Sequence, residues 1–252
     1  MNHYIVKKEF KEGLYESKGL WMMVAAACIL SCLCILVVNM KEGTSLAQND
    51  VLQYAIKATM FITLTITMVL GSSSFVSERE ENTLESLLLT PISKLSLTLA
   101  KYCGVLIIGL ALYVISIPYL ISIGYGTGMT GSALLIMFFS GVILLLAFVA
   151  ISIVMSIILQ SSRASILTSV LILIIMTFPA FVQSLFKLSA VGQALLAIDP
   201  VACAFNMMNA MLVKQTPFMS LGNYILPLIV FVVISFALLV WASKKVALKG
   251  EN

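Results

Sequence analysis

The segment from Tyr102 to Ser162 reads YCGVLIIGLALYVISIPYLISIGYGTGMTGSALLIMFFSGVILLLAFVAISIVMSIILQSS and contains no Asp, Glu, Lys or Arg. An apolar run of about 18 or more residues is long enough to cross the hydrocarbon core of a bilayer as a helix. This segment holds two such runs, separated by a short turn rich in glycine. It therefore predicts a helical hairpin that crosses a membrane twice.

Similar apolar runs occur on both sides of this segment. The chain has a mean hydropathy of +1.09, with 61% hydrophobic and 10% charged residues, which excludes a soluble globular protein. We expect six membrane-spanning helices, at Leu20–Val38, Ala58–Val76, Leu97–Ile123, Ala133–Leu159, Ile166–Phe186 and Tyr224–Trp241. The spans use most of the 252 residues, so the predicted fold is an all-α membrane protein with one transmembrane domain, residues 1–252.

Lys and Arg are distributed unequally between the two sides of this predicted domain. The side with more of them is expected to be cytoplasmic. The richer side carries the leader, the second and fourth loops and the tail, with Lys7, Lys8, Lys11, Lys18, Arg79, Lys94, Lys101, Arg163, Lys244, Lys245 and Lys249. The other side carries Lys41, Lys57, Lys187 and Lys214. We therefore expect a multi-pass protein of the cell membrane with both termini in the cytoplasm.

The sequence offers little material for catalysis. We expect no ionisable side chain to be buried among the spans, which weakens the case for an ion-coupled carrier. The one histidine, His3, lies in the leader, so neither a zinc protease motif nor a serine–histidine hydrolase fits. The cysteines lack a nearby histidine or carboxylate, and there is no phosphate-binding P-loop. We predict no catalytic residue, no metal site and no cofactor held by this chain.

Hydroxyl side chains recur at helical spacing inside two of the spans. Such stripes either pack helix against helix or line a translocation path, and we favour packing. The residues concerned are Thr59, Thr63 and Thr67 in the second span and Ser152 and Ser156 in the fourth.

The connection after the second span, SEREENTLESLLLTP at residues 77–91, is the most informative loop. Ser77 and Glu80 have the spacing of a capping box, so a helix can begin there. Leu84, Leu87 and Leu88 would share one apolar face, and Pro91 would end the helix. A short amphipathic helix of this kind either lies on the lipid surface or docks into a groove of a cytoplasmic partner.

A resemblance to a known family favours the second alternative, in which this helix docks into a cytoplasmic partner. Glu78-Arg79-Glu80, Thr83-Leu84-Glu85, Leu87-Leu88 and Thr90-Pro91 resemble the E-R-E-x-G-T-L-E-x-L-L-x-T-P signature of ABC-2 type transporter permeases, with Asn82 in place of the glycine. Lys101 resembles the lysine that begins the next helix of that family. Two weaker likenesses are the leader, residues 1–19, as an amphipathic interface helix, and Asp199-Pro200, within an outer loop at 187–222 that the family folds into re-entrant helices.

The resemblance implies a permease subunit of an ABC transporter, an exporter in most relatives. Two permeases, identical or related, would enclose the path, and separate cytoplasmic ATPase subunits would bind ATP and Mg. The coupling helix at residues 77–91 would place its leucine face in the ATPase groove. Its coupling residues would be Glu78, Arg79, Glu80, Thr83, Leu84, Glu85, Leu87, Leu88 and Pro91, and the charged ones would contact the rim of the groove.

Two other functions remain open from the sequence. A membrane immunity or sensor protein of similar hydropathy would need no ATPase and would tolerate changes in the coupling helix. A membrane-embedded lipid-modifying enzyme would need converging Asp, His or Arg residues, and the charged cluster at residues 78–85 forms no recognisable catalytic set.

Overall fold

The computed structural model describes residues 19–39, 45–81, 83, 93–125, 128–183, 189–212 and 221–246. Within these residues the protein is helical and contains no strand, which confirms the all-α prediction. The helices in chain order are α2 (Gly19–Asn39), α3 (Ser45–Ser73), α4 (Val76–Glu80), α6 (Lys94–Gly124), α7 (Thr130–Ile158), α8 (Ser162–Phe181), α10 (Ala190–Ile198), α11 (Pro200–Leu212) and α12 (Gly222–Ser243). The predicted interface helix at residues 1–19 lies almost entirely outside the described part.

Six of these helices, α2, α3, α6, α7, α8 and α12, are long and apolar enough to cross a membrane, as the sequence predicts. The bounds of five agree closely with the prediction, but α3 begins at Ser45, well before the predicted start at Ala58. The helix continues through Lys57, whose ammonium lies 5.3 Å from the ring centre of Tyr54 and 5.2 Å from that of Phe205. Hydropathy detects only the apolar part of a helix. Outside that part, aromatic rings can stabilise a lysine within the same helix, so the helix can be longer than its apolar run.

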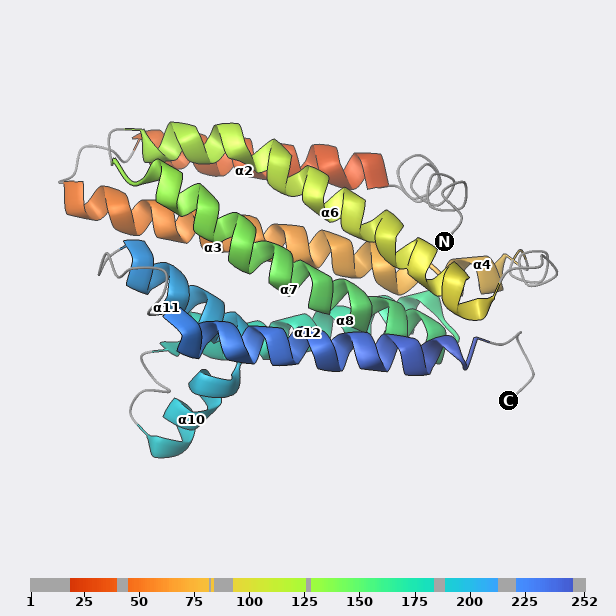
Figure 1. Ribbon diagram of the computed structural model, residues 1–252. Helices are drawn as coiled ribbons and strands as arrows, with labels where there is room; N and C mark the ends of the chain where they lie inside the picture. Colours follow the sequence, from red (N-terminus) through yellow and green to blue (C-terminus); the bar gives the residue numbers. More distant parts are fainter. Residues whose placement is uncertain are drawn as a thin grey trace.

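Helix α7 lies at the centre of the bundle, in contact with α3, α6, α8, α11 and α12 (Figure 1). Its side chains at Leu145, Phe148 and Ile153 are fully buried. Helix α2 lies at the edge, against α3 and α6. Because lipid tails are as apolar as these side chains, close packing and hydrogen bonds must hold the helices together.

Glycines permit the closest of these approaches. A Cβ atom built on Gly71 of α3 would lie 2.0 Å from the Oγ of Ser152 on α7. One built on Gly109 of α6 would lie 2.7 Å from a methyl of Leu145. The backbones of α3 and α6 therefore pack directly on side chains of α7, at points where a larger residue would not fit.

The α10–α11 pair is bent by 88° at Asp199-Pro200 and lies at one end of the bundle (Figure 1). Asp199 accepts a hydrogen bond from the backbone N–H of Val201 at 3.0 Å, which caps the start of α11. Helix α11 packs against α3, α7, α8 and α12, and α10 projects from the bundle. These helices are those expected between the last two spans, where the described part covers residues 189–212 of the predicted loop. Helix α4 lies at the opposite end.

Candidate functional site

Helix α4 follows α3 after a tight turn, and a residue of a different helix caps its start. The backbone N–H groups of Phe75 and Val76 donate to the Oγ of Ser156 on α7, at 2.8 and 3.2 Å. The side chains of Phe75 and Val76 are fully buried. These N–H groups belong to the first turn of a helix, where no backbone carbonyl is in reach, and the Ser156 hydroxyl satisfies them.

The capping box predicted for Ser77 and Glu80 is wrong. Helix α4 has its N-cap at Phe75, two residues before Ser77, and Phe75 makes no side-chain cap. The Ser77 hydroxyl donates to the carbonyl of Ser73 in α3 at 2.7 Å, while the Glu80 carboxylate bonds to another helix. The Glu80 carboxylate thus has a partner across the tertiary structure, while the Ser77 hydroxyl bonds one turn back, to the end of α3.

Glu78 connects α4 to α6. Its Oε1 lies 2.5 Å from the Nζ of Lys101, whose side chain is 3% exposed, and the Glu78 side chain is 16% exposed. The same ammonium lies 5.3 Å from the ring centre of Phe75. The expectation that no ionisable side chain is buried among the spans is therefore wrong. Lys101 is buried because a carboxylate and an aromatic face compensate for its lost hydration.

Arg79 connects α4 to the end of α7. Its Nη1 donates to the carbonyl of Leu159 at 3.1 Å and its Nη2 to the carbonyl of Ile157 at 3.3 Å. The residue is 7% exposed. The last carbonyls of a helix lack partners within it and carry partial negative charge, so a guanidinium at this position satisfies and neutralises them.

Glu80 connects α4 to the start of α8. Its Oε1 accepts from the backbone N–H of Ser162 at 2.9 Å, and its Oε2 accepts from the Ser162 hydroxyl at 2.6 Å. The N-cap residue Ser161 makes no side-chain cap, and the carboxylate of Glu80 caps the start of α8 instead. An anion is stabilised at a helix N-terminus by the partial positive charge there.

Three consecutive residues thus connect one short helix to three membrane helices, and α3 leads into it covalently. We name Glu78, Arg79 and Glu80, with their partners Lys101, Ser156 and Ser162 and the carbonyls of Ile157 and Leu159, the α4 junction. The sequence indicated the tripeptide as coupling residues and Lys101 only as a likeness to the lysine that begins the family's next helix, and it did not show that Glu78 and Lys101 bind each other. It missed the cap made by Ser156, because a serine in an apolar run carries no sign of its distant partner.

Thr83 lies just beyond α4. Its N–H and its hydroxyl both lie within hydrogen-bond distance of the Glu78 carbonyl, at 2.9 and 3.2 Å. The other predicted coupling residues, Leu84, Glu85, Leu87, Leu88 and Pro91, lie outside the described part of the chain.

Comparison with protein families identifies the family of the chain. The model of the ABC-2 family of transporter proteins matches residues 20–241. The chain belongs to this family. A search of curated proteins finds no match. The match confirms the family suggested by the motif at residues 78–91, and it extends over all six spans of this multi-pass membrane protein.

The hydroxyl stripes of this ABC-2 family protein face the interior of the single chain. Thr59, Thr63, Thr67, Ser152 and Ser156 are each at most 2% exposed. Thr67 donates to the carbonyl of Thr63 and Ser152 to that of Val149, both at 2.8 Å within their own helices. These bonds satisfy the hydroxyls and leave their carbon atoms to pack against neighbours. The contacts therefore favour helix packing over a polar path.

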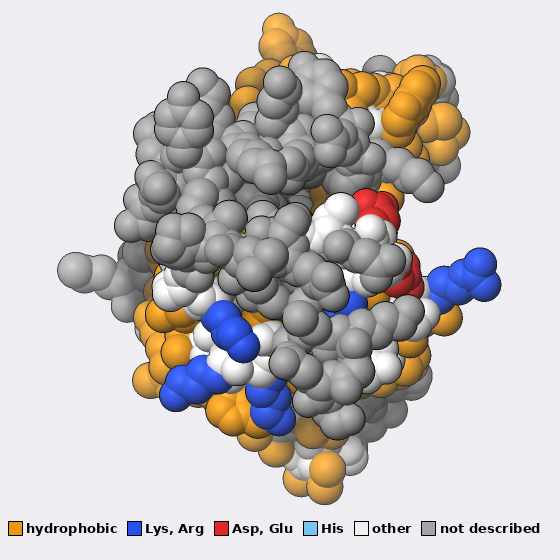
Figure 2. Space-filling model, turned by 90° about the vertical axis from the view of Figure 1, so that its right-hand side faces the viewer, with side chains coloured by type: hydrophobic (Ala, Val, Ile, Leu, Met, Phe, Trp, Pro, Cys, Tyr) orange, Lys and Arg blue, Asp and Glu red, His pale blue; other side chains and the backbone are white. Residues whose placement is uncertain are grey.

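The α4 end of the transporter protein carries much of its exposed charge. Figure 2 shows Lys and Arg together with Asp and Glu side chains on this end, and hydrophobic side chains around it. The exposed charged residues at the helix ends there are Glu80, Glu81, Lys94, Arg163, Lys244 and Lys245. Those Lys and Arg residues of the richer side that the structure describes thus gather at one end; Lys7, Lys8, Lys11, Lys18 and Lys249 lie outside the described residues.

Proposed function

We propose that this chain is the permease subunit of an ABC exporter and that α4 is where cytoplasmic ATPase subunits act on it. Two permeases, identical or related, would form the path, and the partner ATPases would bind ATP and Mg. The observation that carries the proposal is the α4 junction, in which Glu78, Arg79 and Glu80 bind α6, α7 and α8. The ABC-2 family membership supports the transport role.

The junction suits the transmission of movement into the membrane. A displacement of α4 would act on α6 through Lys101, on the last carbonyls of α7 through Arg79, and on the N-terminus of α8 through Glu80. Hydrogen bonds that involve a charged group are stronger than neutral ones, so they would hold the helices to α4 while it moves. The loop beyond Thr83, with Leu84 and Leu88, would then meet the ATPase, and the tripeptide would pass the movement on.

We place the α4 end in the cytoplasm and the α10–α11 end outside, with the protein in the cell membrane. The gathering of Lys and Arg at the α4 end supports this orientation. Among the described residues, the charged side chains that are buried are Arg79 and Lys101, and both are engaged at the junction. The rest of the described interior is apolar or carries neutral polar groups, which suits an amphipathic or hydrophobic cargo.

The experiment that tests the coupling role separates binding of the ATPase from its response. Tagged wild-type protein is purified from its native membranes in mild detergent, and the ATPase protein and ATPase activity that accompany it are measured. Leu84→Asp/Leu88→Asp should lose the ATPase, because the apolar face that meets the groove is gone. Glu80→Ala should retain the ATPase, but its activity should no longer differ from that of the ATPase alone.

Glu81→Ala is the matched control, because Glu81 is an exposed neighbour of Glu80 at the end of the same short helix. It should behave as the wild type does. If folded wild-type protein brings down no ATPase, the permease proposal is wrong and a non-transporting immunity or sensor protein becomes the better explanation. If Glu80→Ala and Glu81→Ala behave alike, the junction does not carry the signal.

A further inference from the structure

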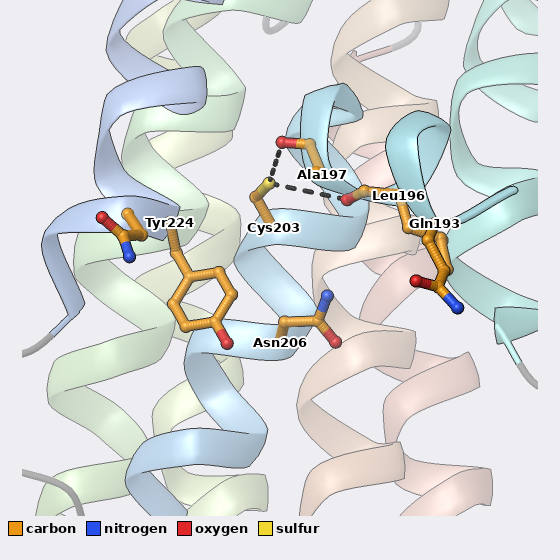
Figure 3. Close-up of a pocket in the computed structure, with 7 residues that line it drawn as sticks. Gln193, Leu196, Ala197, Cys203, Asn206 and Tyr224 are labelled. Carbon is orange, nitrogen blue, oxygen red and sulfur yellow. Dashed lines mark hydrogen bonds between the residues drawn. The ribbon is translucent and has the colours of Figure 1, made fainter. Parts of the chain in front are cut away.

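A pocket of about 420 Å³ lies at the end of the bundle opposite α4, between α10, α11 and the start of α12 (Figure 3). Three helices contribute to its lining. The described lining residues are Gln193, Leu196 and Ala197 of α10, Cys203 and Asn206 of α11, and Asn223 and Tyr224 of α12. Gln193, Leu196 and Ala197 have the i, i+3, i+4 spacing of one helix face, and Cys203 and Asn206 are likewise three residues apart. The pocket is therefore formed by faces that the 88° bend at Asp199-Pro200 brings together.

The polar groups in this pocket are neutral. Gln193, Asn206 and Asn223 each supply a carboxamide, which both donates and accepts hydrogen bonds, and Tyr224 adds a phenol hydroxyl. The Cys203 thiol points toward the carbonyls of Leu196 and Ala197 at the α10 side, at 3.8 and 3.3 Å. None of the seven described lining residues carries a formal charge. An anionic group entering here would lose hydration without a counter-charge, and the Asp199 carboxylate near Cys203 would repel it, whereas hydroxyl and amide groups would find partners of both kinds.

The pocket lies beside an exposed apolar surface. Val191, Leu195 and Ile198 of α10 are 73%, 50% and 73% exposed. Their i, i+4, i+7 spacing makes them one apolar stripe along the same short helix whose other residues line the pocket. Hydrocarbon chains are as apolar as these side chains, so the stripe is suited to contact with them. Helix α10 thus presents an apolar face suited to the hydrocarbon chain of an amphiphile and a polar, uncharged face suited to its head group.

We propose that this pocket binds the uncharged, hydroxyl-rich head of an amphiphile, of the glycosyl or polyol class. The head enters among the carboxamides of Asn206 and Asn223 and the hydroxyl of Tyr224, and the hydrocarbon chain lies along the apolar stripe of α10. A volume of about 420 Å³ is at the small end for ligand pockets, which fits a head group rather than a whole amphiphile. This binding does not require transport. The proposal can therefore be tested separately from the coupling role of α4.

Photolabelling tests the binding with the full-length protein alone. The protein is placed in phosphatidylcholine vesicles that contain a photoactivatable monoglucosyl diacylglycerol, and labelling of the α10–α12 segment is measured by mass spectrometry. Asn206→Leu removes a lining carboxamide and keeps the number of non-hydrogen side-chain atoms, and Asn209→Leu makes the same change three residues further along α11, at a residue that is not among the described lining residues. Asn206→Leu should reduce labelling about 3- to 10-fold, the loss expected for one or two neutral hydrogen bonds, and Asn209→Leu should not.

Competition establishes the chemical class of the ligand. Unlabelled glucosyl diacylglycerol should reduce labelling of this segment, and phosphatidylglycerol with the same acyl chains should not. Equal competition by the anionic lipid would overturn the proposal, as would equal labelling of Asn206→Leu and Asn209→Leu. A bilayer lipid and an exported cargo could both carry such a head. If Asn206→Leu also slows ATP-driven movement of a fluorescent glucosyl lipid in vesicles with the partner ATPase, the pocket receives cargo. An unchanged rate identifies a resident lipid.

Discussion

Replacement of Ser156 by alanine tests whether a residue of α7 caps α4 across the bundle. The change removes the acceptor of two backbone N–H groups, those of Phe75 at 2.8 Å and Val76 at 3.2 Å, next to side chains that are fully buried. It deletes one oxygen atom and leaves almost no cavity. The cost therefore comes from the two N–H groups that lose their partner.

The two distances set the size of the effect. A buried donor without a partner costs about 1–3 kcal/mol, and the longer of these bonds lies at the limit of good hydrogen-bond geometry. One full loss and one partial loss give about 2 kcal/mol for local opening of α4. Since about 1.4 kcal/mol is a factor of ten, the open state should become about 30 times more populated.

Hydrogen–deuterium exchange of the detergent-solubilised protein measures this opening directly. A peptide that contains Phe75 and Val76 should exchange about 30-fold faster in Ser156→Ala than in the wild type. Ser152→Ala is the matched control. Ser152 is equally buried and lies one turn earlier on α7, but its hydroxyl donates to the Val149 carbonyl of its own helix. Equal protection of this peptide in the two variants would refute the remote cap.

Two further predictions concern the junction and the α3–α7 contact. Lys101→Met should lower the free energy of unfolding by about 3 kcal/mol, because it leaves the Glu78 carboxylate without its buried counter-charge. The double variant Lys101→Met/Glu78→Gln should recover part of that loss. Thermal unfolding measures both. A Lys101→Met protein as stable as the wild type would show that the pair does not hold α4 to α6. Gly71→Ala should cost about 1–3 kcal/mol, because its Cβ would lie 2.0 Å from the Ser152 Oγ. Ser152→Ala should relieve part of that clash, and Gly131→Ala, where no atom lies within 4 Å, should leave the melting temperature unchanged or higher.

The sequence predicted the spans correctly because the cost of placing a residue in hydrocarbon is a property of each residue. The run at residues 102–162 became α6, a turn and α7, with ends within three residues of the expected ones. Where the prediction failed, a residue far away in the sequence stabilised a charged side chain that hydropathy alone would keep out of the helix interior. Helix α3 extends past Lys57 because Phe205 of α11 lies beside its ammonium, and Lys101 is buried because Glu78 reaches it.

The motif at residues 77–91 shows the same division in one place. The sequence singled out the tripeptide Glu78-Arg79-Glu80 through its resemblance to the family whose model matches residues 20–241. It predicted charged contacts with a partner protein for these residues, whereas the contacts described for them are made within the chain. Their role in coupling stays a prediction, now through the helices they bind.

The sequence alone determined that this protein is an all-α bundle crossing the membrane, roughly where each span lies, and which loop carries its family signature. Only the tertiary structure decided which helices are neighbours, how the α4 junction is made and that α10, α11 and α12 enclose a neutral polar pocket. In soluble proteins an apolar face on a polar helix shows which side is buried. A membrane-spanning helix that is apolar on every side gives no such indication of which side is buried against other helices. The pairing of such helices depends on close fits such as Gly71 on Ser152 and on single hydrogen bonds such as that of Ser156, which exist only between residues far apart in the chain.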